Sequence, residues 1–342
     1  MDEKYVDFAV NTVVELCKIP SPTGYTKKAE KYLQTVFKEL GCKFYRSLKG
    51  NIVVQLGGDL DPLVLAAHID TLGGMVRSIK SNGRLRITNV GSYPFVLIEN
   101  EDCIIHTRDG REFEGTFKHI DPAVHVNGNL GKEERTDKNV EVVLDEKVNK
   151  REDVEELGVS VGDFISIDPR TKMTKKGFIK SRHLDDKASA GVLVSLARYI
   201  KENKIDLKRK IYLIFTTYEE VGHGGSCIPD DVVEMISVDM GAVGDDLKTD
   251  EYKVSICAKD SGGPYDYDVT TKLINVAKNE KLNYAVDIYP SYGSDVEATL
   301  RAGYEIKHGL IGPGVSASHG YERTHREGIK NTLELLLKYI QE

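Results

Sequence analysis

The sequence predicts an α/β protein in which one discontinuous α/β domain carries an inserted β-rich domain. Apolar, β-branched runs alternate with amphipathic stretches in the first 70 residues and again from about residue 171. Short strands broken by glycine turns fill the region between. The chain has 342 residues, 40% hydrophobic and 30% charged, so it can bury a large core. We expect one domain from residues 1–70 and 171–342, and an insert from residues 71–170.

The N-terminal 70 residues are predicted to form two helices followed by two strands. Apolar residues recur with helical spacing in VDFAVNTVVELCKI (6–19) and KKAEKYLQTVFKELG (27–41). The runs NIVVQL (51–56) and LVLAAHID (63–70) are short and nearly all apolar, which is typical of strands buried on both faces. This order indicates the first layers of an α/β domain.

The residue pattern of region 71–170 differs from that of the regions on either side. Turn sequences occur at SNG (81–83), RDG (108–110) and VNGNLG (126–131), and short apolar runs lie between them. One acidic stretch, LDEKVNKREDVEELG (144–158), has helical character. This pattern favours a small β-rich insert.

The alternation of helices and strands returns after the insert. A helix is expected within FIKSRHLDDKASAGVLVSLARYIKENK (178–204). Strands are expected at KIYLIFTT (210–217), VVEMISVD (232–239) and AVDIYP (285–290), with a further strand before the last helix. Helices are expected near 267–280, from 294, and at GIKNTLELLLKYIQE (328–342).

Charge and cysteine content exclude several classes of function. The net charge of -7 argues against a general nucleic-acid or anionic-membrane surface, because both need a basic face. No apolar run is long enough to cross a bilayer, and the first residues lack a signal-peptide pattern, so we expect a cytoplasmic protein. The five cysteines are far apart without a CxxC pair, which indicates buried thiols rather than disulfides or a thiolate zinc site.

Acids and histidines cluster where the expected strands end. The carboxyl ends of strands in an open α/β sheet form its binding edge, so these side chains are expected to meet there. Carboxylate and imidazole groups suit zinc, cobalt or manganese. The residues concerned are His68 and Asp70, Glu219 and Glu220, Asp239, then His183, Asp185 and Asp186 before a helix, with His319 and His325 near the C-terminus.

Each of these residues also has an ordinary structural interpretation. Asp185 or Asp186 could cap the following helix, and Glu219 and Glu220 could form a solvated turn. Isolated histidines such as His308 are typically surface or hydrogen-bonded residues. Several strand ends carrying acids after buried runs are costly unless a cation compensates them, so the convergence favours a metal site.

Five motifs resemble those of the M42 family of dinuclear metallo-aminopeptidases, which includes the tetrahedral aminopeptidases and proteins once labelled CelM endoglucanases. They are AAHIDTLGGMV, IKSRHLDDKASAGVL, TTYEEVGHGG, SVDMG and ASHGYERTH, preceded by PSPTGYT. The resemblance covers essentially the whole chain. It implies a phosphorylase/hydrolase-like, mixed-sheet α/β catalytic domain with an inserted small β-barrel domain that mediates dimerisation.

The resemblance also implies two divalent metal ions per subunit, zinc or cobalt. His68, Asp185 and Asp239 would hold one ion, and Asp185, Glu220 and His325 would hold the other, with Asp185 bridging the two.

Two further acids receive roles by the same resemblance. Glu219 would be the general base, and Asp70 would accept the free N–H of the His68 imidazole and orient it. His183 and His319 stay open, and Asp186 is interpreted as a cap or supporting contact rather than a ligand. The resemblance places the stretches KDSGGPYD and YPSYGSDVEAT near the substrate, whereas for any individual residue in them simple turn chemistry is the favoured interpretation.

The activity implied is metal-assisted removal of N-terminal residues from peptides by a homo-oligomer, in the family a tetrahedral dodecamer. One alternative is an amidohydrolase acting on N-acyl amino acids with the same metals, which N-blocked substrates would reveal. Another is an endoglucanase using the two glutamates, but that leaves the histidines and aspartates unexplained. A non-catalytic metal-binding protein would not require Glu219.

Overall fold

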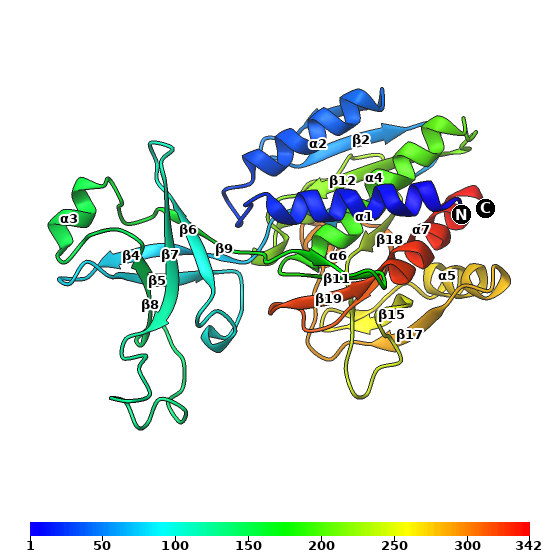
Figure 1. Cartoon of the computed structure of the whole chain (residues 1–342). Helices are drawn as coiled ribbons and strands as arrows, with labels where there is room; N and C mark the ends of the chain where they lie inside the picture. The colour runs from blue at the N-terminus through cyan, green and yellow to red at the C-terminus, as the bar shows by residue number, and fades with distance from the viewer. The chain divides into compact units, whose positions relative to one another are not determined.

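The structure, a computed structural model, describes all residues from Met1 to Glu342 (Figure 1). The chain forms two compact units, one made of Met1–Asp70 with Arg170–Glu342 and the other of Thr71–Pro169. Each unit has its own hydrophobic core.

The larger unit is built on a ten-stranded mixed sheet in the order β1-β2-β12-β3-β13-β18-β15-β16, with β14 beside β18 and β17 beside β15. The four central strands β12, β3, β13 and β18 run parallel, so their carboxyl ends lie along one edge. The strands are β1 (Lys43–Arg46), β2 (Ile52–Leu56), β3 (Leu60–His68), β12 (Arg209–Thr216), β13 (Glu234–Val238), β14 (Gly241–Ala242), β15 (Val254–Asp260), β16 (Gly263–Pro264), β17 (Tyr284–Ile288) and β18 (Lys307–Val315).

Strand β3 shows why the central runs are apolar without interruption. Leu63, Leu65 and Ala67 belong to one buried cluster, whereas Val64 and Ala66 belong to another. Successive side chains of a strand point to opposite faces of the sheet, so both faces of β3 must be covered.

Helices cover the sheet on both sides. Five of them contribute apolar residues to one core cluster, and α6 contributes Val296 to the cluster on the opposite face. Helix α4 packs against both α1 and α7. The helices are α1 (Glu3–Lys18), α2 (Lys27–Glu39), α4 (Leu184–Glu202), α5 (Tyr267–Asn279), α6 (Asp295–Arg301) and α7 (Arg326–Gln341), with short 3₁₀ turns η2 (Glu219–Val221) and η3 (Gly224–Ser226) after β12.

A small three-stranded sheet accompanies the large one in the same unit. It consists of β10 (Lys172–Met173), β11 (Phe178–Ser181) and β19 (Glu322–His325), in the order β10-β11-β19. Strand β11 leads into α4, and β19 leads directly into α7.

The smaller unit is a closed six-stranded barrel in the order β4-β5-β8-β7-β6-β9, in which all strand pairs are antiparallel. Closure leaves no unpaired edge. The predicted helical stretch 144–158 is helical only at α3 (Arg151–Glu156). The other elements are β4 (Gly73–Ile79), β5 (Leu85–Val90), η1 (Phe95–Leu97), β6 (Asp102–His106), β7 (Glu112–His119), β8 (Val140–Leu144) and β9 (Phe164–Ile167).

The predicted fold class is confirmed, since a mixed α/β unit accompanies a closed β-barrel. None of the helices combines the length and the hydropathy needed to cross a membrane.

Candidate metal centre

Three neighbouring parallel strands end at the edge of the sheet where most of the candidate residues lie. Strand β3 ends at His68, β12 is followed by Glu219 and Glu220, and β13 is followed by Asp239. A fourth contribution comes from the start of α4, where Asp185 and Asp186 are buried although their backbone is not yet helical. The sheet edge therefore gathers acids that are far apart in sequence.

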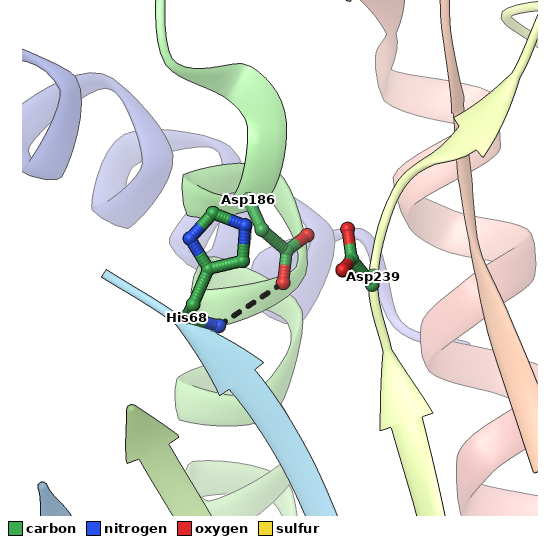
Figure 2. Close-up of side chains that lie close together, drawn as sticks. All are labelled: His68, Asp186 and Asp239. Atoms are coloured by element: carbon green, nitrogen blue, oxygen red, sulfur yellow. Dashed lines mark hydrogen bonds between the residues drawn. The ribbon is translucent and has the colours of Figure 1, made fainter. Parts of the chain in front are cut away.

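His68, Asp186 and Asp239 form the tightest group. Each offers a ligand atom, and these atoms all lie within 4.8 Å of one another. Figure 2 shows the two carboxylates facing each other beside the imidazole. The backbone N–H of His68 donates to Asp186 Oδ2 at 3.3 Å, while Asp186 Oδ1 is buried without a hydrogen-bond partner. An unpartnered carboxylate oxygen among other buried acids fits a cation.

Asp185 lies between two imidazoles. Its Oδ1 is 3.1 Å from His68 Nε2, and its Oδ2 is 3.5 Å from His319 Nε2. The Ser318 hydroxyl also donates to Oδ2, at 2.9 Å. The two oxygens of this one carboxylate thus face different histidines, which is the arrangement needed to bridge two cations.

The adjacent glutamates also face different histidines. Glu219 Oε2 is 3.7 Å from His68 Nε2, and Glu220 Oε2 is 3.8 Å from His319 Nε2. The Glu220 side chain is only 4% exposed, whereas that of Glu219 is 16% exposed. Glu219 is therefore the more accessible of the two acids.

The expected role of Asp70 needs correction. His68 Nδ1 contacts the backbone carbonyl oxygen of Asp70 at 2.9 Å, and the nearest carboxylate oxygen of Asp70 is farther away, at 3.7 Å. The carboxylate instead accepts from the Thr23 hydroxyl at 2.6 Å and from the backbone N–H groups of Glu219 and Glu220 at 3.2 and 3.3 Å. Asp70 thus orients the imidazole through its backbone and holds the two glutamates through its side chain.

His325 makes its contacts outside this group of residues, contrary to the expected ligand set. Its Nε2 lies 2.7 Å from the carbonyl oxygen of Lys176, and its Nδ1 accepts from the backbone N–H of Glu327 at 3.1 Å. His325 is the N-cap residue of α7, a role that occupies one ring nitrogen. The histidine beside Asp185 and Glu220 is His319, six residues earlier in the same motif.

The electrostatics of the site reflect several acids buried together. Burial, aided by the charge of Asp185, raises the pKa of Glu220 to about 8 and that of Asp239 to about 7. Burial also raises the pKa values of Glu219 and Asp186 well above their ordinary range.

The pKa values of Asp185 and His68 shift in the direction opposite to the one that burial alone would give. Burial opposes ionisation of Asp185, but hydrogen bonds with His319 and His68 lower its pKa. Burial likewise opposes protonation of His68, but its hydrogen bond with Asp185 and the charge of Glu219 raise its pKa. Divalent cations would relieve the repulsion among the surrounding carboxylates, so the donor set fits metal binding.

Sequence reasoning missed supporting residues around this centre. Thr23 lies within the early PSPTGYT stretch, and Ser318 precedes His319. The carboxylate of Asp295 accepts from the Thr216 hydroxyl at 2.5 Å, and burial raises its pKa to about 6. Glu322 accepts from the backbone N–H groups of two site residues. The sequence offers one signal for such supporting residues: they are polar and lie within or beside the motifs of the site.

The fold and the site together place a candidate metal-binding group at the carboxyl edge of an α/β sheet. The M42 glutamyl aminopeptidase family matches residues 50–335, and the chain belongs to this family. The protein is accordingly an aminopeptidase.

Individual relatives agree with this assignment. YhfE of Bacillus subtilis (strain 168), to which an aminopeptidase activity is ascribed, is 46% identical over 332 residues, covering 96% of each chain. The TET aminopeptidase of the marine sediment archaeon Thaumarchaeota archaeon SCGC AB-539-E09 superposes with a TM-score of 0.89 at 18% identity, covering 98% of this chain and 97% of that one. The TET1 peptidase of Pyrococcus horikoshii, which can assemble into a tetrahedron or a large octahedral shell, gives 0.86 at 19% identity over 98% and 99%.

Proposed function

We propose that this aminopeptidase uses two divalent metal ions and Glu219 as general base to remove N-terminal residues from peptides. The observation that carries the proposal is the position of Asp185, whose two oxygens face His68 and His319. A carboxylate placed in this way is able to bridge two cations a few ångströms apart.

The first ion would be held by His68, Asp185 and Asp239, with Asp186 beside them as an additional oxygen donor. The second would be held by Asp185, Glu220 and His319. Imidazole and carboxylate ligands suit zinc and cobalt. When bound, such ions polarise a carbonyl group and make a water molecule more acidic.

Glu219 is the residue proposed to move the proton. It lies beside His68 and is less buried than Glu220. In the proposed mechanism, its carboxylate takes a proton from the attacking water and returns it to the amine that leaves the cleaved peptide bond. The Asp70 carboxylate holds the backbone N–H of Glu219 and so restrains the position of the base.

We also propose a cytoplasmic homo-oligomer, for which the tetrahedral assembly of the P. horikoshii relative provides the precedent. The insert would mediate dimerisation. Val124 and Val126 of the insert are largely exposed, which is consistent with a surface that another copy covers. Five free cysteines suit a reducing compartment. Light scattering during gel filtration would give the mass of the assembly, and a monomer at micromolar concentration would contradict this proposal.

The activity is tested by loading the metal-free protein with cobalt or zinc and supplying a panel of aminoacyl-anilides with free amines. N-acetylated analogues and a chelator serve as controls. We expect cleavage of the free-amine substrates alone, abolished by the chelator.

Cleavage of the acetylated substrates would instead indicate an amidohydrolase acting on N-acyl amino acids. Release of reducing sugar from a β-glucan in the presence of the chelator would indicate a glycosidase. The panel also reports which first side chain is preferred, a property that depends on the shape of the substrate pocket.

A further inference from the structure

Glu322 is a buried acid that the proposed mechanism does not use. It is the first residue of β19, and it is 2% exposed. Its two oxygens accept from backbone N–H groups rather than from a lysine or an arginine. A buried carboxylate without a cationic partner is costly unless hydrogen bonds satisfy both oxygens.

Two backbone N–H groups supply those hydrogen bonds. Glu322 Oε2 accepts from the backbone N–H of Asp185 at 3.0 Å, and Oε1 accepts from the backbone N–H of His319 at 3.0 Å. The donors belong to two of the three residues proposed to hold the second metal, and they come from different parts of the chain. One carboxylate therefore sets the distance between their backbones.

The segment that carries His319 needs such a tether. It is the tip of a tight hairpin between β18 and β19, closed where Ser316 and Arg323 exchange backbone hydrogen bonds at 2.8 and 3.0 Å. Ala317 and His319 adopt the left-handed conformation, with φ of 60° and 66°. That conformation is uncommon for residues other than glycine, so contacts with surrounding residues must hold it.

Neighbouring contacts bring Glu322 next to Asp185. Strand β19 pairs with β11, and Glu322 lies opposite Ser181 in that pairing. The chain continues from Ser181 to Asp185 through Arg182, which donates to the carbonyl oxygen of Gly320 in the hairpin at 3.3 Å. The hairpin and the start of α4 thus form one hydrogen-bonded assembly with Glu322 at its centre.

We propose that Glu322 is a positioning residue for the second metal, holding Asp185 and His319 at the separation that this ion requires. The inference rests on the proposed two-metal function. Groups that orient metal ligands typically contribute a factor of about 10 to 100 in metal affinity. The first ion also takes Asp185 as a ligand, but His68 and Asp239, which Glu322 does not contact, hold it as well, so its affinity should fall less than that of the second.

The test is Glu322→Gln, followed by calorimetric titration of the metal-free protein with zinc. The amide keeps the size of the side chain but offers only one acceptor oxygen, so one of the two N–H groups loses its partner. We expect the second zinc to bind about 10 to 100 times more weakly and the first to lose less affinity than the second. His319→Ala provides the reference for loss of the second ion, and adding Glu322→Gln to it should change zinc binding little.

Glu327→Gln is the matched control, because this exposed glutamate lies near His325 outside the site. It should leave both affinities unchanged. Glu322→Asp serves as a second variant if the Glu322→Gln variant folds poorly. It keeps the charge but is one methylene shorter, and it should also weaken the second ion more than the first.

Unchanged zinc binding in both Glu322 variants would overturn the inference. Equal weakening of both ions together with a lower Tm of the metal-free protein would overturn it too, since that pattern indicates general destabilisation. Neither result contradicts the proposed function if the wild type binds two ions and cleaves free-amine substrates. A wild type that binds no metal would instead refute the proposed function itself.

Discussion

Glu219 and Glu220 are neighbours in the chain, yet their side chains contact different parts of the site. The Glu219 carboxylate approaches His68, and the Glu220 carboxylate approaches His319. The 3₁₀ turn in which both lie spreads consecutive side chains apart, and the Asp70 carboxylate fixes that turn through both backbone N–H groups. At the scale of single residues, backbone geometry therefore separates the proposed base from the proposed metal ligand.

Glu219→Gln tests this separation. The amide cannot accept the proton of the attacking water, so kcat should fall by about 10²- to 10⁴-fold. Both metal ions should stay bound, as measured by atomic absorption after dialysis. Loss of one ion in this variant would mean that the roles of the two glutamates are the reverse of those proposed.

His325→Ala tests the proposal that His319, and not His325, holds the second metal ion. Because His325 caps α7 and contacts Lys176, the alanine variant should lose about 0.5–2 kcal/mol of stability in urea titrations. It should retain both metal ions and near-normal turnover once folded. A variant of normal stability that has lost one ion would restore His325 as a ligand.

At the scale of elements, the loop from Thr217 to Ser226 is held from two sides. On one side, Asn51 Nδ2 donates to the carbonyl oxygen of Gly224 at 3.2 Å, and Thr217 donates to Asn51 Oδ1 at 3.1 Å. On the other side, Thr299 of α6 donates to the carbonyl oxygen of Gly225 at 2.6 Å. These contacts position a loop that carries both glutamates, and loops need such support because they lack the regular hydrogen bonds of helices and strands.

Gly224→Ala tests the support from α6. A Cβ atom on Gly224 would overlap Asp295 Oδ1 and lie 2.9 Å from the backbone nitrogen of Glu219. The loop would have to shift, at a cost of about 1–3 kcal/mol in stability, and kcat/KM should drop at least about tenfold because a misplaced base is inefficient.

Gly244→Ala is its control. A Cβ atom at Gly244 would meet only Leu247 at an ordinary 3.6 Å, so stability and activity should hardly change. Equal behaviour of the two alanine variants in kinetics and urea titrations would show that the contact between α6 and the loop has no bearing on catalysis.

At the scale of the whole molecule, the acids that favour metal binding destabilise the metal-free fold. Burial raises the folded-state pKa values of Asp295, Asp239 and Glu220 to about 6, 7 and 8, above their values in an unfolded chain. A carboxyl group with a raised folded pKa contributes stability below its unfolded pKa and loses that contribution as pH rises through the folded pKa. The raised pKa of His68 acts in the same direction.

The Tm of the metal-free protein should therefore fall by several degrees between about pH 5 and pH 8. Zinc should restore Tm more at pH 8 than at pH 5, because metal ions compete with protons for the same ligands. Differential scanning calorimetry at fixed ionic strength, with and without zinc, measures both effects. A metal-free Tm that rises steadily over this range would contradict the assignment of repelling buried acids.

Much of the fold could be predicted because its patterns are local. The apolar run around Leu65 predicted a strand buried on both faces, and glycine turns predicted the β-rich insert. The stretch 144–158 was harder to predict, because charged residues with helical spacing also suit a solvated loop. Only Leu144, the last residue of β8, pairs in the barrel, and only Arg151–Glu156 forms a helix.

The sequence by itself determined the kind of chemistry, since acids and histidines followed buried strands whose parallel order could be inferred. It could not determine which histidine of ASHGYERTH faces the acids. Both lie in a short segment, and local spacing does not record the direction of a side chain at a hairpin. Tertiary structure decided that question: β19 pairs with β11 and places His325 as the N-cap of α7, whereas the backbone N–H of His319 donates to Glu322 and its ring faces Asp185. The physical reason is that a ligand set is defined by contacts between distant segments, and only the folded chain brings those segments together.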